Sequence, residues 1–313
     1  MSHEELLAAP LAYENRTFLN SADGRILRIL SEYAEPLARF RRERIQDTVV
    51  FFGSARFHSR HHAQNVLELL EKPGSAKPAD YETQVKKARA AVEMARYYEE
   101  ARRLAYLLTR WSMELPFKRH RFVVTSGGGP GIMEAANEGA KEAGGKTIGL
   151  NIRLPYEQMP NQHITPELNF EFHYFFMRKY WFAYLAKALV IFPGGFGTLD
   201  ELFEILTLAQ TQKLAKKILV LIYGTEYWSR IFNFQALVDS GTVAAEDLNL
   251  FHMVNSPEEG FEHLREGLSK YHLQAPARRE KEEEGPDIAH TRSAPNGEEA
   301  EDGAPEHQAS RNR

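Results

Sequence analysis

The 313-residue sequence contains no cysteine. This absence excludes disulfide bonds, thiolate metal sites and cysteine nucleophiles, and it fits a reducing compartment. The sequence also lacks any run near the roughly 18 consecutive apolar residues that a membrane-spanning helix needs. Its first residues, MSHEELLAAPLAYENR, have neither the basic start nor the apolar run of an export signal. We therefore expect a soluble, cytoplasmic protein without a membrane partner.

An excess of positive charge is also missing. The chain has 39 Lys and Arg against 43 Asp and Glu, and residues 275–313 hold 6 of the basic and 10 of the acidic groups. The rest of the chain is therefore neutral. Proteins that bind a phosphate backbone or an anionic membrane through their main surface carry a basic excess. We expect no nucleic-acid partner, although local basic patches are compatible with this composition.

Composition divides the chain into three parts. Residues 1–46 have the pattern of two short helices, with Ser21 as the cap of one and Pro36 opening the next, and form a helical extension. Residues 47–273 contain the apolar runs of a large core and form the main domain. Residues 274–313 are rich in Pro, Gly, Glu and Ala and cannot bury enough surface to offset their ordering entropy. We expect this last part to be a disordered acidic tail.

Short apolar runs alternate with helical patterns through the main domain. This alternation predicts right-handed crossovers and a Rossmann-like, doubly wound parallel sheet with helices on both faces. The predicted strands are residues 47–52, 121–126, 146–152, 188–193 and 217–223, and the predicted helices are residues 81–113, 130–143, 177–187, 198–212 and 226–239.

Small residues follow three of the predicted strands: Gly53, Ser54 and Ala55, then SGGGPG at 126–131, then PGGFGT at 193–198. In an open parallel sheet the ligand binds at the carboxyl ends of the strands. Glycines there bring backbone N–H groups close to an anion, and the following helix adds unpaired N–H donors. Tight turns without a ligand are the alternative reading. Two glycine-rich loops at one edge favour phosphate binding, and their shortness suits a monophosphate.

Glu201 and Asp200 follow the glycine-rich loop at 193–198. Thr198 and Glu201 have the spacing of a capping box, in which Glu201 would accept a hydrogen bond from the backbone N–H of Thr198. Beside a phosphate loop, however, a carboxylate could contact ribose hydroxyls and polarise a water molecule. The local pattern leaves both readings open.

Two cations, Arg178 and Lys179, open the helix before the PGG strand. They oppose the helix dipole at that position, which favours an anionic partner over a solvated basic surface as their explanation. The surrounding aromatic residues, at 170–182, fit a core or a subunit contact, and one or two of the rings could stack on a base.

Motifs of other chemistries are missing. The loops lack GxGxxG spacing and the Lys-Ser/Thr ending of a P-loop, and the sequence has neither GxSxG nor HExxH. The twelve histidines lack metal-ligand spacing. We expect neither a metal nor a cofactor.

Together, FFGSA at 51–55, SGGGPGIMEAAN at 126–137, MRK at 177–179 and PGGFGTLDELFEILT at 193–207 resemble the LOG ("lonely guy") family. The similarity covers about residues 47–270. It implies a homodimeric, Rossmann-like, metal-independent phosphoribohydrolase that releases free base from nucleoside 5′-monophosphates. Many members carry an older label of lysine decarboxylase, but nothing in the sequence indicates a pyridoxal phosphate site.

The resemblance also implies roles for individual residues. The catalytic Arg and Glu of the family fall on Arg178 and Glu201. We expect the phosphate to be bound by Gly53, Ser54, Gly128, Gly129, Gly131, Lys179, Gly194, Gly195, Gly197 and Thr198.

Three positions differ from the short plant-type pattern. Phe176 and Met177 replace a His-Glu pair before the Arg-Lys, and Lys187 stands where that pattern has Asp. These differences favour purine monophosphates such as AMP over cytokinin riboside monophosphates. A non-catalytic carrier of a nucleotide or phosphorylated cofactor is the main alternative function, and a nucleic-acid-binding module is a second.

Overall fold

The structure is a computed structural model that describes residues 9–72, 80–155, 159–214 and 216–273. The expected acidic tail at 274–313 lies outside the described residues. A seven-stranded parallel sheet forms the centre of the fold, in the order β4-β3-β2-β1-β5-β6-β7. The strands are β1 (Thr48–Phe52), β2 (Val123–Ser126), β3 (Thr147–Ile152), β4 (Asn169–Phe172), β5 (Ala186–Ile191), β6 (Leu219–Tyr223) and β7 (Phe251–Val254).

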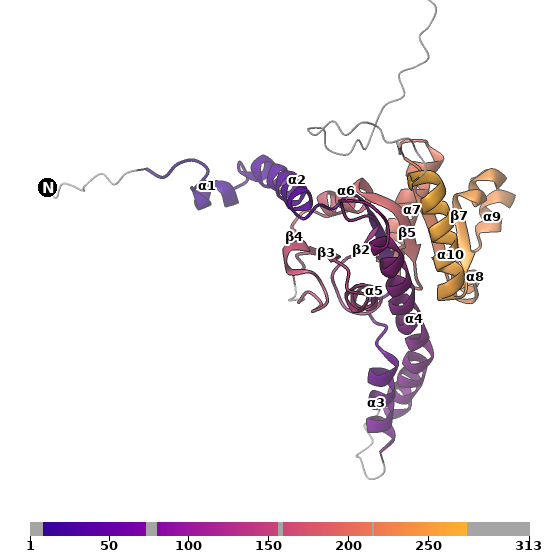
Figure 1. Ribbon diagram of the computed structural model, residues 1–313. Helices are drawn as coiled ribbons and strands as arrows, with labels where there is room; N and C mark the ends of the chain where they lie inside the picture. Colours follow the sequence, from indigo (N-terminus) through magenta and orange to yellow (C-terminus); the bar gives the residue numbers. More distant parts are fainter. Residues whose placement is uncertain (1–8, 73–79, 156–158, 215, 274–313) are drawn as a thin grey trace, which may run out of the picture.

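Helices cover both faces of this sheet, so the predicted doubly wound fold is confirmed (Figure 1). Alternating side chains of each strand point to opposite faces: Val49 and Phe51 pack in one core, Val50 and Phe52 in the other. The first core is covered by α4 (Tyr81–Met113), α5 (Ile132–Glu142) and α10 (Pro257–Leu268), and the second by α2 (Arg25–Arg42), α6 (Phe175–Tyr184), α7 (Phe196–Gln210) and α8 (Thr225–Ile231).

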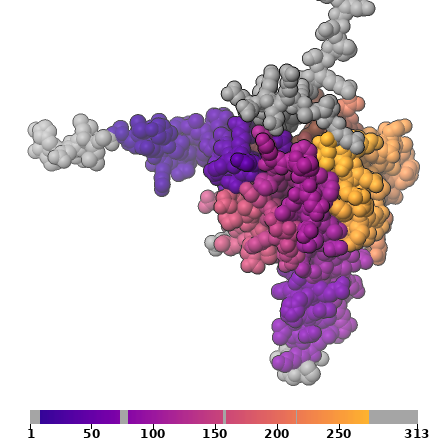
Figure 2. All heavy atoms as spheres, viewed as in Figure 1, coloured from indigo at the N-terminus to yellow at the C-terminus, as the bar shows by residue number. Residues whose placement is uncertain are grey.

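Two helical projections leave the body (Figure 2). One is α1 (Arg16–Asn20) with the start of α2, and the other is α3 (Arg60–Glu71) with the first half of α4. The remaining elements are α9 (Phe234–Asp239) and the short turns η1 (Pro166–Leu168), η2 (Ala245–Leu250) and η3 (Ser269–Leu273). Among the described residues, no helix is long and apolar enough to cross a membrane.

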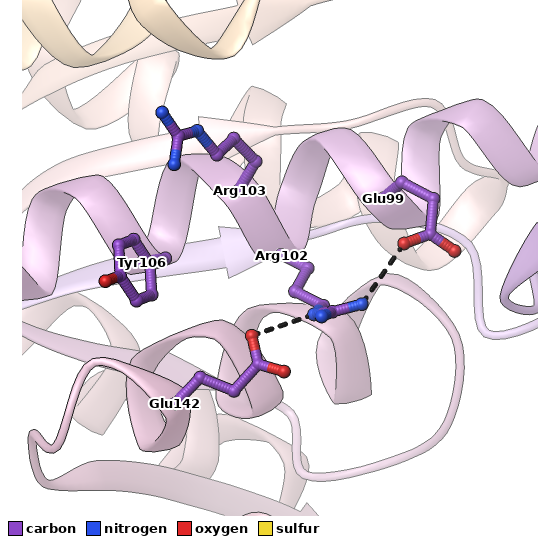
Figure 3. Close-up of a pocket in the computed structure, with 5 residues that line it drawn as sticks. All are labelled: Glu99, Arg102, Arg103, Tyr106 and Glu142. Atoms are coloured by element: carbon purple, nitrogen blue, oxygen red, sulfur yellow. Dashed lines mark hydrogen bonds and ion pairs between the residues drawn. The ribbon is translucent and has the colours of Figure 1, made fainter.

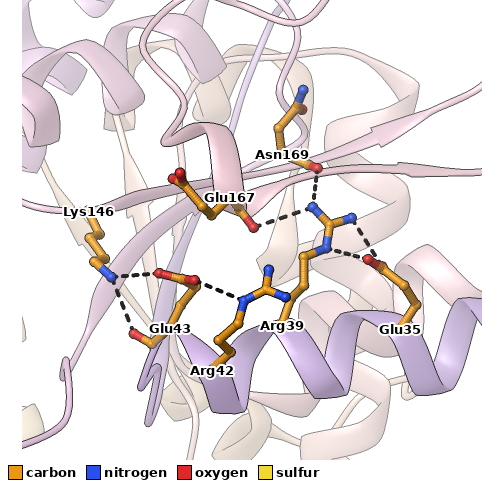
Figure 4. Close-up of polar contacts among 7 residues, drawn as sticks. All are labelled: Glu35, Arg39, Arg42, Glu43, Lys146, Glu167 and Asn169. Carbon is orange, nitrogen blue, oxygen red and sulfur yellow. Dashed lines mark hydrogen bonds and ion pairs between the residues drawn. The ribbon is translucent and has the colours of Figure 1, made fainter.

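The end of α2 is bound to the edge of the sheet by ionic hydrogen bonds (Figure 4). Arg39 donates through Nη1 to the backbone oxygens of Glu167 in η1 (3.3 Å) and of Asn169, the first residue of edge strand β4 (2.9 Å). Lys146 Nζ donates to Glu43 Oε2 at 2.9 Å. The Arg39 guanidinium also lies 4.1 Å from the ring centre of Phe170. The N-terminal helix α2 is therefore packed on the sheet domain.

Several predicted boundaries were wrong. Pro36 lies inside α2, and the N-cap of that helix is Gly24. The Ser21 hydroxyl, three residues before that N-cap, accepts the Gly24 N–H at 3.3 Å. The helix predicted over 177–187 ends at Tyr184, since Ala186 and Lys187 belong to β5. The helix predicted over 226–239 is two helices, α8 and α9, separated at Phe232 and Asn233.

Candidate functional site

The order in which the chain adds strands to the sheet reverses between β1 and β5. From β1 the chain adds β2, β3 and β4 on one side, then returns to place β5, β6 and β7 on the other. In such sheets, the carboxyl ends of the strands at the reversal form a crevice that binds ligands. The loops after β1 and β5 are the first and third of the three predicted glycine loops, and the second follows the neighbouring strand β2.

Backbone hydrogen bonds join these three loops directly. Ser54 donates its N–H to the oxygen of Pro193 at 2.9 Å, and its own oxygen accepts the N–H of Ile132 at 3.0 Å. Gly131 has φ +74°, and a Cβ there would lie 2.3 Å from the Ser54 oxygen. Only glycine combines this conformation with so close an approach. Gly53 is also close to its neighbours, because a Cβ there would lie 2.7 Å from the Ile132 side chain.

The loop at 127–131 is held from behind by a buried polar network. Ser126 Oγ donates to Asn137 Oδ1 at 2.6 Å, and Asn161 Nδ2 donates to the same oxygen at 2.9 Å. Asn161 also donates to the backbone oxygens of Gly128 and Gly129, each at 3.1 Å through Nδ2. The Gly128 N–H is occupied by Ser126 Oγ at 3.0 Å. This loop is fixed, and Gly128 contributes to its shape rather than a free donor.

The loop at 193–198 presents open backbone donors. Among the contacts of the described chain, the N–H groups of the four residues Gly194 to Gly197 have no acceptor. No heavy atom lies within 4 Å of the Cβ positions of Gly195 and Gly197, so space is open above both. Tyr227 fixes the loop by donating its hydroxyl to the Gly194 oxygen at 3.0 Å. Four consecutive free N–H groups at a helix start form a donor set that suits a phosphate.

Glu201 is 6% exposed and lies on the second turn of α7, just after these donors. The capping-box interpretation of this residue is wrong, because α7 begins at Phe196 with Gly195 as its N-cap. Thr198 is therefore inside the helix, buried against Gly194, and donates its N–H to the Gly195 oxygen at 3.0 Å. The Glu201 carboxylate is free of any capping task.

Burial raises the pKa of Glu201 to about 7, although the nearby cations Lys179 and Arg178 act to lower it. Lys179 Nζ lies 3.7 Å from Glu201 Oε1, 2.8 Å from Asp200 Oδ2 and 2.7 Å from Glu204 Oε2. Burial alone would lower the pKa of Lys179, but hydrogen bonds to Asp200 and Glu204 raise it. Its ammonium group is thus occupied by carboxylates of α7.

Arg178 is half-buried and lacks a carboxylate within 4.0 Å among the described residues. Its Nε is buried without a hydrogen-bond partner. The guanidinium lies over the rings of Phe175 and Phe182, with centroids at 5.2 and 5.4 Å. Its Nη1 is 3.9 Å from the Cβ position of Gly127, which places it beside the second loop. A half-buried cation with a buried, unpaired Nε there favours a bound anion.

The helix that carries Arg178 is held by α2. The Glu32 carboxylate accepts the N–H groups of His173 (2.7 Å) and Tyr174 (3.3 Å), at the start of α6. The Trp181 indole donates to the Glu32 backbone oxygen at 2.8 Å. Sequence reasoning did not identify Glu32, Asn161 or Tyr227. For Glu32, the one available signal is the preference of acidic side chains for helix starts. This preference could not identify Glu32, because Glu32 and α6 lie far apart in sequence.

A shallow hollow on α4 and α5 is a separate feature (Figure 3). Its lining includes Arg102, whose guanidinium lies 3.3 Å from Glu99 and 2.9 Å from Glu142. With Arg103, which also lines the hollow, two arginines balance two glutamates. The described residues contain no group of three His, Cys, Asp or Glu side chains that could hold a metal ion. The carboxyl ends of β1, β2 and β5 therefore carry the candidate site.

The sequence and the fold are similar to those of known proteins. Residues 133–264, which include Arg178 and Glu201, match the family described as "Possible lysine decarboxylase". No curated protein matches the sequence. Two solved structures of the molybdenum cofactor carrier protein from Chlamydomonas reinhardtii are 18% and 19% identical, cover 71% and 72% of this chain and 99% of their own, and have TM-scores of 0.40. TM1055, a structural genomics target, is 18% identical over 70% of this chain and 99% of its own, with a TM-score of 0.40.

Proposed function

We propose that this chain, which carries a domain of the LOG family, the family described as possible lysine decarboxylases, hydrolyses the N-glycosidic bond of nucleoside 5′-monophosphates. The products are a free base and ribose 5-phosphate. One observation carries the proposal: a buried carboxylate, Glu201, follows directly on four free backbone donors, beside an unpaired guanidinium. Purine nucleotides such as AMP are the expected substrates, and cytokinin riboside monophosphates are a narrower possibility within the same class.

The phosphate is proposed to bind the N–H groups of residues 194–197, with Arg178 balancing its charge. Binding energy from this remote group would position the ribose for reaction. Gly53, Ser54, Gly129, Gly131 and Thr198 would shape the crevice around it.

Glu201 is proposed to face the ribose. As a carboxylate it would contact the ribose hydroxyls, orient the attacking water and offset the positive charge that grows on the sugar ring. A pKa of about 7 poises this group to accept a proton from water near neutral pH. Arg178 would assist departure of the base. We assign Lys179 to positioning of Glu201 rather than to the phosphate, because its ammonium is bound by three carboxylates.

The decarboxylase label does not fit these residues. A pyridoxal phosphate enzyme forms an imine with a lysine amine, which must be free and deprotonated. Lys179 is the lysine that the sequence motifs bring to the crevice, and its carboxylate partners raise its pKa. This environment keeps the ammonium form, so we derive no step through that cofactor.

Base release tests the proposal directly. Purified protein is incubated with AMP, GMP, CMP and isopentenyladenosine monophosphate, and free base and ribose 5-phosphate are separated by chromatography. We expect release from at least one purine nucleotide and none from Glu201→Gln. Tight nucleotide binding by the wild-type protein without release would identify the carrier alternative instead.

We also expect a cytoplasmic homodimer or higher homo-oligomer that does not bind nucleic acid. Apolar side chains at the start of α2 and α6 support association, since Ile26, Leu30, Phe175 and Phe176 are each more than half exposed. Light scattering after size exclusion tests this assembly. A monomer at micromolar concentration would contradict it.

A further inference from the structure

A second cluster of charged residues lies at the opposite end of the sheet. Asp47 precedes β1, Arg121 precedes β2, Lys187 is the second residue of β5, and Lys216 comes shortly before β6. The four strands are neighbours, in the order β2-β1-β5-β6. Their amino ends therefore gather these side chains at the edge away from Arg178 and Glu201. The π-helical turn η3 adds His272 to the cluster.

The acidic member of this cluster is fully occupied. Asp47 is 1% exposed, its Oδ2 lies 2.8 Å from Arg121 Nε, and its Oδ1 accepts the N–H of Phe122 at 2.6 Å. Arg121 also donates through Nη2 to the backbone oxygen of His272 at 3.1 Å. One cation and one carboxylate thus balance each other.

Lys216 has a structural contact of its own. Its ammonium donates to the backbone oxygen of Tyr184, the last residue of α6. A cation there is favourable for the helix dipole. No carboxylate lies within 4.0 Å of this ammonium among the described residues, and burial, followed by the charge of Lys187, lowers the pKa of Lys216 to about 7.

Lys187 occupies an irregular position in β5. Thr48 pairs with Ala186 and Val49 with Ala188, so Lys187 is an extra residue in the ladder. Such bulges turn a side chain away from its regular direction. Lys187 is mostly buried, and its ammonium makes no hydrogen bond or ion pair within the described chain. Burial lowers its pKa, and Asp47, the nearest opposite charge, offsets this only in part because Arg121 opposes it.

His272 presents a second unsatisfied group. Its Nε2 is buried without a hydrogen-bond partner, while the ring also hydrogen-bonds to the backbone of Lys217. Burial, followed by the charge of Lys187, lowers its pKa to about 4, and Arg121 and Lys216 act in the same direction. Lys187, Lys216 and His272 are each only partly buried as whole residues, so the cluster lies at the surface of the domain.

We propose that this cluster is a binding site for a tetrahedral oxyanion of the phosphate or sulfate class. Three cations converge here on one carboxylate that already has its partners, and Lys187 and His272 Nε2 lack any. Buried cations in proteins are normally paired, and an oxyanion offers several acceptors to several donors at once. Lys187 is its main ligand, Arg121 and Lys216 supply charge, and His272 donates through Nε2 when it becomes protonated in acid solution. The site does not depend on the proposed enzymatic function.

His272 reports on this site specifically. Its imidazole is titrated by NMR in the wild-type protein with sodium sulfate, which remains a dianion across the range, and with sodium chloride at equal ionic strength. His272→Gln identifies the resonance. We expect sulfate to raise the pKa of His272 by about one unit, because the bound dianion favours the imidazolium. The same pKa in both salts would overturn the proposal.

A pair of lysine variants separates this site from general salt effects and from sulfate in the crevice. Lys187→Met keeps the aliphatic stem and removes the charge, while Lys146→Met removes a part-buried lysine that already pairs with Glu43 at 2.9 Å. We expect sulfate to raise the melting temperature of Lys187→Met less than that of the wild type. The response of Lys146→Met should equal that of the wild type. An undiminished response in Lys187→Met would show that the cluster binds no anion, and the imidazole titration decides the question if that variant does not fold.

Discussion

Lys179 Nζ lies 3.7 Å from Oε1 of Glu201, with Asp200 and Glu204 completing its surroundings at 2.8 and 2.7 Å. A lysine that follows the proposed catalytic arginine is thereby bound to the helix of the proposed catalytic glutamate. The contact joins α6 to α7 across the crevice, and the positive charge of Lys179 acts to lower the pKa of Glu201.

Removing this ammonium should change the pH dependence of base release. The pKa of Glu201 is already raised to about 7, and Lys179 is the largest influence that lowers it. In Lys179→Met that pKa should rise further. Because the proposed mechanism uses the carboxylate form, the acidic limb of the kcat profile should move to higher pH, with Lys146→Met as the control. A limb that stays in place or moves to lower pH would contradict this role.

Glu201 should also cost stability in alkaline solution. Its folded pKa of about 7 exceeds the ordinary value of 4.5, so its contribution favours the folded state at low pH and is lost as the pH rises through 7. Glu201→Gln should therefore be more stable than the wild type at pH 8.5, by at most on the order of 3 kcal/mol, with a smaller gain at pH 5.5. Urea unfolding at both pH values measures the gain. Glu204→Gln alters a more exposed carboxylate of the same helix and should not gain stability at pH 8.5.

Glu32 should support catalysis from outside the crevice. Its carboxylate accepts the two N–H groups at the start of α6, four and five residues before Arg178. Loss of such a cap costs about 1 kcal/mol, so Glu32→Ala should be less stable by that amount. It should also release base more slowly, while Glu32→Gln keeps an acceptor oxygen and most of the rate. Equal rates of base release in both variants would show that the contact of Glu32 with α6 does not support catalysis.

Two adjacent glycines provide a matched test of the loop at 193–198. A Cβ on Gly194 would lie 2.1 Å from Thr198 Oγ1 and 3.1 Å from the Ser54 N, so Gly194→Ala should destabilise the fold by more than ~2 kcal/mol. A Cβ on Gly195 meets nothing within 4 Å. Gly195→Ala should fold normally and weaken AMP binding, because its methyl group enters the space above the donors. Thermal unfolding and calorimetric titration distinguish these effects, and unchanged AMP affinity in Gly195→Ala would place the phosphate elsewhere.

The sequence predicts the central strands well because their residues are apolar on both faces. Val49, Val50, Phe51 and Phe52 are all buried, and such continuous runs mark a parallel strand between two helical layers. The edge strand β4 was missed because only Phe170 and Phe172 of its four residues are buried, and these aromatic residues also fit a core helix or a subunit contact.

Boundaries failed where two patterns overlap. Residues 180–186, which join α6 to β5, are apolar or aromatic without a break, so the sequence predicts Lys187 in the helix although it lies in the strand. The spacing of Thr198 and Glu201 matches a capping box, but Gly195 begins the helix earlier because the loop bends at the glycines. Motif residues at the loops could be found from sequence alone. Their supports, Glu32, Asn161 and Tyr227, could not, since each reaches the site through the tertiary fold.

The most direct test of this account is a crystal structure of Glu201→Gln with AMP bound. We expect the phosphate on the backbone N–H groups of residues 194–197 with the Arg178 guanidinium beside it, and the ribose hydroxyls facing the side-chain amide that replaces the Glu201 carboxylate. AMP bound with its phosphate away from this loop, or with its ribose turned away from position 201, would contradict the proposed enzyme.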